Sequence, residues 1–308
     1  MKNILYIEPN NNNRDYLYYT LIGKGLTQTK DINLTIGNSV DNYNLDDYNL
    51  IILGYGACDT CKFTSNKLNL NTKTPIIAFL FKLSINKEEK FKFLKHNNII
   101  TFGQQKRICE FEKEYDIKIN PTLYPFDSTL FKFLNIEKLY DIGMTGALHN
   151  SKYYQDGSYT KTEANIRERL VNLLQNTNYK KYIKCSDKSY SESKIVDTHE
   201  YIKTINQSKI WIATNADYGD LTPRYCEIIA CKTLLFCNEI HCNSFSNYLK
   251  DGETCVFFKN DLSDIIEKID YYLNNEPLTK KITNTAYNIF ETNFSSQNIV
   301  KKYLNYAK

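Results

Sequence analysis

Long apolar runs are absent from this 308-residue sequence: none approaches the roughly 20 residues of a membrane-spanning helix. The first apolar stretch, residues 4–7, ends at Glu8 and Pro9 and is too short for the core of a signal peptide. We therefore expect a cytoplasmic protein. Heavy use of Asn, Lys, Ile and Tyr is typical of A/T-rich genomes such as those of large DNA viruses, in which case the compartment is the host cytoplasm.

Several metal, redox and nucleic-acid motifs are also missing. The one CxxC, residues 58–61, has no second CxxC or HxxxH partner, which favours a structural loop over a zinc or redox site. Nine cysteines and no export signal indicate reduced thiols. No GxGxxG follows the first apolar stretch, which argues against a dinucleotide-dependent oxidoreductase. The net charge of +4 is mild and dispersed, so no nucleic-acid partner is expected.

Apolar strand patterns alternate with amphipathic helix patterns along the whole chain. Strands are predicted at 4–7, 32–36, 50–53, 75–81, 99–102, 140–144, 182–184, 209–213 and 233–237, and helices at 15–26, 87–95, 163–174, 201–205, 225–231, 261–273, 278–290 and 297–306. This alternation predicts an α/β protein with two Rossmann-like parallel-sheet domains facing a central cleft. We expect an N-terminal domain at 1–135 and a C-terminal domain at 136–294, with helix 295–308 packing back on the first.

The segment 215–232 is the one that carries chemistry. Thr222 suits an N-cap and Pro223 the first helical position, so the helix start would offer the free N–H groups of Arg224 and Tyr225. Such a terminus binds phosphate, and an arginine fork adds charged donors. Glu227 lies three residues on, where its carboxylate could accept bonds from ribose hydroxyls. The alternative is a capped helix with a surface ion pair.

Four segments occur in the order found in one enzyme group. They are YPFDSTLF at 124–131, YDIGMTG at 140–146, DLTPRYCEIIAC at 220–231 and YLKDGETCVFF at 248–258. Together they resemble GT-B glycosyltransferases, with the closest likeness to the CgeB-like group that has a "glycosyl transferases group 1" type C-terminal domain. The resemblance covers about residues 124–305.

The resemblance implies roles for individual residues in binding a nucleotide-sugar donor. Glu227 would hold the ribose, and the helix start Thr222–Tyr225 with Arg224 would hold the diphosphate, which Gly146 would let approach the backbone. Lys188 would contact the diphosphate or the base, or it is a solvated loop lysine. Retaining members carry a second Glu eight residues upstream, where this chain has Gly219. Because this Glu is missing, retention of configuration is not supported. Either Asp217 or Asp220, which lie nearby, would contact the hydroxyls of the donor sugar, or neither does.

An inverting reaction needs a general base in the N-terminal domain, for which we expect Glu8 or Asp59 from their loop positions. His149 follows the Gly146 turn and is a further candidate catalytic residue that could face the cleft. Arg224 would stabilise the leaving diphosphate, and the absence of any D-x-D triplet predicts that no metal or other cofactor is used. The expected function is metal-independent glycosyl transfer from a UDP-, GDP- or dTDP-sugar to a saccharide, protein or other acceptor. The alternative is a non-catalytic module of the same fold that binds nucleotide sugars or protein.

Overall fold

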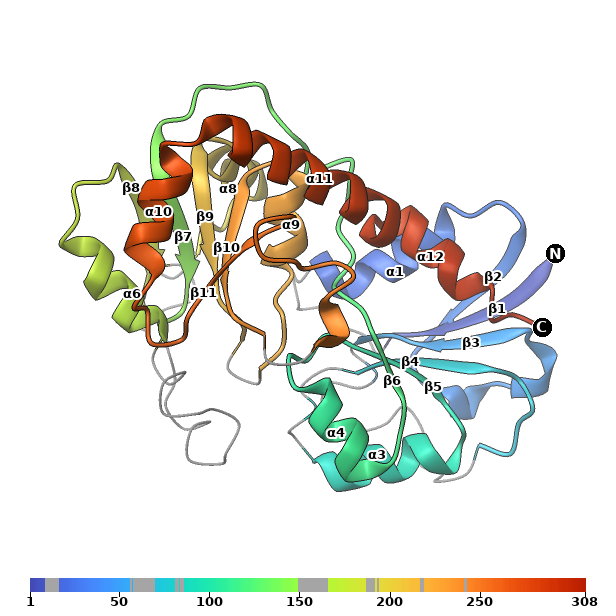
Figure 1. The fold of residues 1–308 in the computed structure, drawn as a ribbon. Coiled ribbons are helices and arrows are strands. Elements are labelled where there is room, and N and C mark those ends of the chain that lie inside the picture. The colour runs from blue at the N-terminus through green and yellow to red at the C-terminus, as the bar shows by residue number, and fades with distance from the viewer. Residues whose placement is uncertain are drawn as a thin grey trace. The chain divides into compact units, whose positions relative to one another are not determined.

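The computed structural model describes residues 1–8, 17–55, 57, 70–80, 83, 86–148, 166–186, 192, 194–216, 219–240 and 243–308. They form two compact units, Met1–Phe126 with Thr292–Lys308, and Asp127–Glu291 (Figure 1). Each unit has a sheet in which every recorded strand pair is parallel. The predicted fold class, α/β with two Rossmann-like parallel sheets, is confirmed.

The first unit has a six-stranded sheet in the order β2-β1-β3-β4-β5-β6. Its strands are β1 (Lys2–Ile7), β2 (Ile32–Gly37), β3 (Leu50–Leu53), β4 (Ile76–Leu80), β5 (Ile100–Gly103) and β6 (Ile119–Pro121). Every residue of β3 and β4 is buried, as their unbroken apolar sequences predict for central strands covered on both faces. The apolar pattern of the sequence therefore decides which strands occupy the middle of this sheet.

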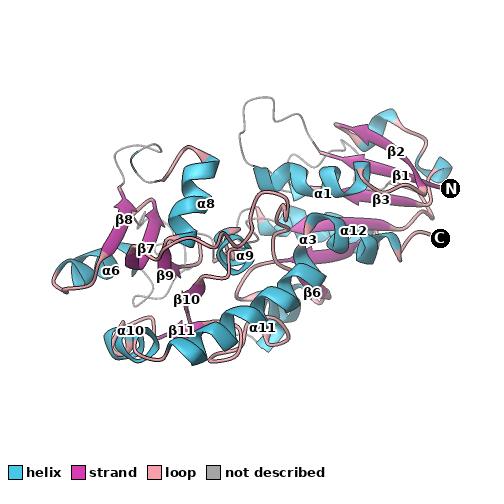
Figure 2. Cartoon of the chain, turned by 90° about the horizontal axis from the view of Figure 1, so that it is seen from above, coloured by secondary structure: helices cyan, strands magenta, loops and turns pink. Residues whose placement is uncertain are grey.

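Four α-helices accompany this sheet: α1 (Leu17–Thr27), α3 (Lys87–His96), α4 (Ile108–Tyr115) and α12 (Ser296–Leu304). Helices α1 and α12 lie side by side (Figure 2). A Cβ on Gly25 would lie 2.2 Å from the carbonyl oxygen of Ser296, so the close approach of these helices requires a glycine. The chain re-enters the unit where the Phe126 amide donates to Phe294 (3.0 Å) and the Ser296 amide to Phe126 (2.9 Å).

The second unit has a five-stranded sheet in the order β11-β10-β9-β7-β8. Its elements are β7 (Tyr140–Gly146), α6 (Ile166–Gln175), β8 (Lys181–Cys185), α8 (Thr198–Asn206), β9 (Ser208–Ala213), α9 (Arg224–Ala230), β10 (Leu234–Asn238), β11 (Val256–Phe258), α10 (Ile265–Leu273) and α11 (Glu276–Phe294), whose last residues belong to the first unit. One apolar core joins strands β7, β9, β10 and β11 to α6 and α10. This core fixes the strand ends from which the candidate site is built.

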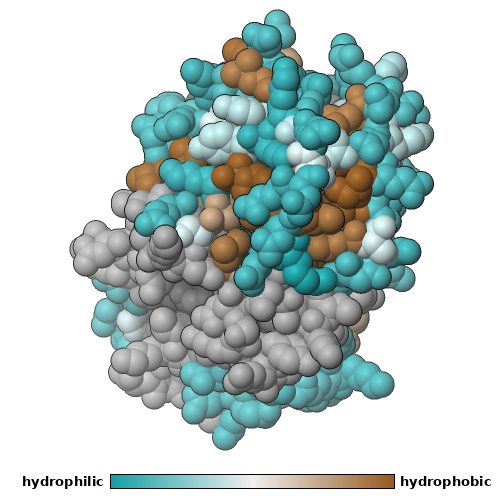
Figure 3. Space-filling model, turned by 90° about the vertical axis from the view of Figure 1, so that its left-hand side faces the viewer, coloured by the Kyte–Doolittle hydropathy of each residue, from teal (hydrophilic) through white to brown (hydrophobic). Residues whose placement is uncertain are grey.

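Short 3₁₀ helices complete the described structure: Val40–Asn42, Leu45–Asp47 and Asn243–Phe245. On the face seen in Figure 3 most of the described surface is hydrophilic, and apolar side chains form separate patches. Exposed large apolar residues of the second unit are Phe133, Ile136, Leu139, Val196 and Tyr271. Among the described helices, none is long and apolar enough to cross a membrane.

Candidate functional site

The site is built where three neighbouring strands of the second sheet end. Strands β10, β9 and β7 are adjacent and parallel, so their carboxyl ends at Asn238, Ala213 and Gly146 share one edge of the sheet. Ligands of open α/β sheets bind outside this edge. The predicted residues Gly146, Arg224 and Glu227 all belong to this unit.

Two guanidinium groups converge on Gly146, the last residue of β7. Its φ of +138° is a conformation that L residues rarely adopt. A Cβ built there would lie 3.5 Å from Nη2 of Arg224 and 3.6 Å from Nη1 of Arg167. The structure thus brings Gly146 and Arg224 together, 78 positions apart in sequence, and adds a second arginine.

Arg224 is the first residue of α9 and is half-buried. Within the described residues its guanidinium makes no hydrogen bond or ion pair, although its charge lowers the pKa of Glu227. A guanidinium carries five N–H donors in a planar fork that matches phosphate oxygens. Beside Gly146, this arginine therefore has donors available for an anionic ligand.

Arg167, on the first turn of α6, was not identified from the sequence as a site residue. It is 8% exposed and donates to Thr214 Oγ1 (2.8 Å), to the Ala147 carbonyl (2.8 Å) and to the Asn215 carbonyl (3.1 Å). These bonds tie the loop after β7 to the loop after β9. The available signal was its position beside Ile166 and three residues before Leu170, on the buried face of the helix.

An amide network fixes the remaining loops at this edge. Asn238 accepts from the Asn215 amide (3.1 Å) and donates to the side chains of Asn215 (2.6 Å) and Asn260 (3.1 Å). The Asn260 carbonyl in turn accepts from Arg169 (2.8 Å). Because fully hydrogen-bonded buried polar groups rigidify their surroundings, this network preorganises the strand ends.

Glu227 lies one turn after Arg224 on α9 and is half-buried. Its Oε2 accepts a hydrogen bond from the hydroxyl of Tyr201 on α8 (3.0 Å). Burial raises the pKa of the Glu227 carboxyl, against the opposing effects of Arg224, Tyr201 and Lys194. Among the described residues, Tyr201 is its one hydrogen-bond partner, which leaves Oε1 as an acceptor for a ligand.

The start of α9 differs from the prediction. The helix begins at Arg224, with Pro223 in the N-cap position, and Thr222 Oγ1 is buried without a hydrogen-bond partner among the described residues. The Tyr225 amide donates to the Thr222 carbonyl (3.1 Å), and the Tyr225 side chain is fully buried. The predictions of a Thr222 side-chain cap and of a free Tyr225 N–H are therefore wrong, because the chain tightens into a 3₁₀-like turn before the helix.

Asp220 is buried, and its carbonyl accepts from the Ala216 amide (2.7 Å) in a turn that contains Gly219 at φ +79°. Its contact with a donor sugar stays a prediction. Four other predicted site residues lie outside the described part of the chain: Asp59, His149, Lys188 and Asp217.

Glu8 follows β1 in the first unit, and its Oε2 accepts from the hydroxyl of Tyr6 (3.0 Å). A Cβ on Gly54 would lie 2.0 Å from the same oxygen, so a larger residue there would displace the Glu8 carboxylate from this position. Burial, together with the Glu8 charge, raises the pKa of Tyr6 well above its ordinary value. The role of Glu8 as a base stays a prediction.

The fold with its two parallel sheets is shared with solved glycosyltransferases. Sucrose-phosphate synthase from Thermosynechococcus elongatus superposes with a TM-score of 0.61 at 9% identity, covering 99% of this chain and 98% of that one. Anabaena HepE in complex with UDP and glucose gives 0.58 at 10%, covering 99% and 98%. TarM gives 0.53 at 14% over 84% of this chain, which spans about half (54%) of TarM's length. The fold is therefore GT-B.

The sequence also matches a known protein family. Residues 164–305 match the model of the family described as "Glycosyl transferase-like", so the predicted resemblance is confirmed. Arg167, Tyr201, Arg224 and Glu227 all lie within the matched residues. Among curated proteins, none matches this chain significantly.

A change of Gly146 to alanine tests its position. The positive φ should cost about 1–3 kcal/mol in the free energy of unfolding, and the added methyl group should weaken nucleotide binding by occupying the space beside Arg224. Gly252, at φ +70°, is the control: Gly252→Ala also places alanine at a positive φ, but away from the site. Equal nucleotide affinity in the two variants, measured by titration calorimetry, would contradict the assignment.

Proposed function

We propose that this protein is a metal-independent glycosyltransferase that uses a nucleotide-diphosphate sugar. The observation that carries the proposal is the half-buried Arg224 guanidinium, which has no partner among the described residues and lies beside the positive-φ Gly146. HepE holds UDP and glucose on the same fold, which supports a UDP-sugar as the first donor to test. GDP- and dTDP-sugars are the other predicted donors.

The residues divide the work of the reaction. As the bond from the sugar to the diphosphate breaks, negative charge grows on the leaving oxygen, and Arg224 stabilises it through charged hydrogen bonds. Gly146 lets the diphosphate approach the backbone, and Arg167 holds the two loops that frame it. Glu227 accepts from the ribose hydroxyls. Glu8 or Asp59 would take the proton from the acceptor, and His149 is a further candidate residue at the cleft.

Nucleotide-dependent thermal stability tests the donor class. UDP, GDP, dTDP and ADP are added separately with EDTA present, and one diphosphate is expected to stabilise the protein by about 2.7 kcal/mol at 100 times its dissociation constant. NAD serves as the dinucleotide control and should have no effect. Stabilisation that requires a divalent cation would contradict metal independence, and stabilisation by none of the diphosphates would contradict the donor site.

Turnover separates an enzyme from a binding module. Donor hydrolysis, or sugar transfer to a panel of saccharide and protein acceptors, is followed by release of the nucleoside diphosphate. Binding without release would favour the non-catalytic alternative.

A further inference from the structure

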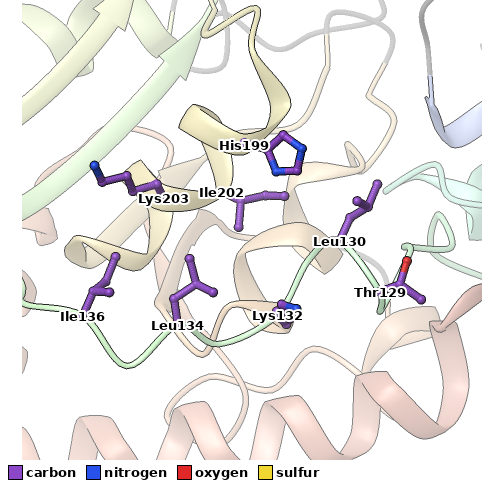
Figure 4. A pocket seen from close by; sticks show the side chains of 8 residues that line it. All are labelled: Thr129, Leu130, Lys132, Leu134, Ile136, His199, Ile202 and Lys203. Atoms are coloured by element: carbon purple, nitrogen blue, oxygen red, sulfur yellow. The ribbon is translucent and has the colours of Figure 1, made fainter.

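The second unit contains a cavity of about 380 Å³ between α8 and the segment 129–136 (Figure 4). Its lining residues are Thr129, Leu130, Lys132, Leu134, Ile136, His199, Ile202 and Lys203. In Figure 4, Leu134 and Ile136 extend toward α8, and Ile202 extends from α8 toward them. The volume falls at the lower end of the range for small-molecule pockets. Glu227 and its partner Tyr201 are not among the lining residues.

The two walls of this cavity are held together by Asn206, the last residue of α8. Its Oδ1 accepts from the Leu134 amide (2.7 Å), and its Nδ2 donates to the Lys132 carbonyl (3.1 Å). Asn206 is fully buried, and nearby the Lys138 ammonium donates to the Ser208 carbonyl (2.8 Å). The segment thus has a fixed position against the helix without belonging to any helix or strand, so the cavity is formed before a ligand arrives.

Basic side chains surround an aliphatic centre. Lys132, Lys203 and His199 are exposed and make no hydrogen bond or ion pair through their side chains within the described structure. Among the described residues that line the cavity there is no carboxylate, and their one hydroxyl, Thr129 Oγ1, already donates to Asp127 (2.6 Å). The lining therefore suits a ligand that combines an apolar body with negative charge.

We propose that this cavity binds a free single-chain aliphatic carboxylate. The apolar walls are branched aliphatic side chains with no aromatic ring for stacking on a sugar or base. These side chains line a concave surface. A concave surface suits an inserted aliphatic chain better than the flat surface of a bilayer. None of the described residues that we assign to the nucleotide site is among the residues that line this cavity.

Titration calorimetry with octanoate, decanoate and dodecanoate below their micelle concentrations tests the proposal. Each added methylene that enters the cavity should raise affinity about three- to fourfold. Decyltrimethylammonium, with the same chain and the opposite charge, should bind at least about tenfold more weakly than decanoate. Absence of decanoate binding, or equal affinity for the two head groups, overturns the proposal. The proposal is also overturned if the protein sediments with phosphatidylglycerol vesicles but does not bind decanoate.

Variants that change the charge or the volume of the cavity test whether decanoate binds there. The double variant Lys132→Glu with Lys203→Glu changes two exposed residues and should weaken decanoate about tenfold or more. Lys280→Glu, an exposed lysine on α11, is the matched control and should change nothing. Leu134→Trp fills the hollow and should abolish binding while circular dichroism stays native. Nucleotide stabilisation should survive in every variant. If decanoate affinity is unchanged in both the charge variant and the volume variant, decanoate binds elsewhere, and the proposed site is wrong.

Discussion

Arg224→Ala is expected to lower the rate of sugar transfer by about 100- to 1,000-fold, the usual effect of removing one preorganised donor from a developing anion. The guanidinium lies beside Gly146 and has no partner among the described residues, so its removal breaks no bond within them. The free energy of unfolding should therefore change by less than about 1 kcal/mol. Single-turnover kinetics with a saturating donor measures the chemical step directly.

Two further arginine variants make this result specific. Arg224→Lys keeps the charge but loses the planar fork, and should recover only part of the rate. Arg107→Ala, on the first unit, removes a surface ion pair with Glu110 and should leave turnover unchanged. Full activity in Arg224→Ala would remove its proposed role in leaving-group stabilisation.

Glu227→Ala is expected to weaken binding of the nucleoside diphosphate by about 10- to 100-fold, since a hydrogen bond to a charged group contributes about 1.5–3 kcal/mol. The affinity should fall for UDP and for uridine alike, because the lost hydrogen bond is to the ribose and not to the phosphates. Glu267→Ala, an exposed glutamate on α10, is the control. Equal affinities in wild type and Glu227→Ala would contradict the ribose assignment.

The pH dependence of the same residue gives a second test. Burial raises the pKa of Glu227 in the folded state, so folding favours its protonated form. The contribution of Glu227 to the free energy of unfolding is therefore greatest below the ordinary glutamate pKa. It falls as pH rises through the raised pKa of the folded state. Glu227→Gln should unfold at a higher temperature than wild type at neutral pH, and the difference should vanish below about pH 4. Nucleotide affinity of the wild type should fall as the carboxylate is protonated.

Much of the fold follows from local pattern. The unbroken apolar run at Ile76–Leu80 predicts a central strand, and the structure buries all of its residues. Helix α8 was predicted over 201–205 but extends from Thr198, because the Asp197 side chain accepts from the Glu200 amide (2.7 Å) and caps an earlier turn. Helix α4 and strand β6 were missed, since eight residues with only Ile108 and Phe111 buried give a weak periodicity.

The candidate site was predictable only where it is local. Arg224 and Glu227 share one short helix, so their spacing was visible in the sequence. Arg167 and Tyr201 act through partners 20 to 48 positions away, and no local pattern records such bonds. Thr222 failed as a cap because the turn before α9 uses its carbonyl instead of its hydroxyl.

The first unit is assembled from both ends of the chain, whereas the second is one continuous stretch, Asp127–Glu291. During synthesis, helix α12, the partner of α1, emerges after the whole second unit, because it is encoded at residues 296–304. The second unit can thus complete its core while the first unit still lacks helix α12. A nascent chain stopped before residue 292 would expose the α1 surface that Gly25 fits to Ser296, and this surface is where a chaperone would bind or premature association would begin.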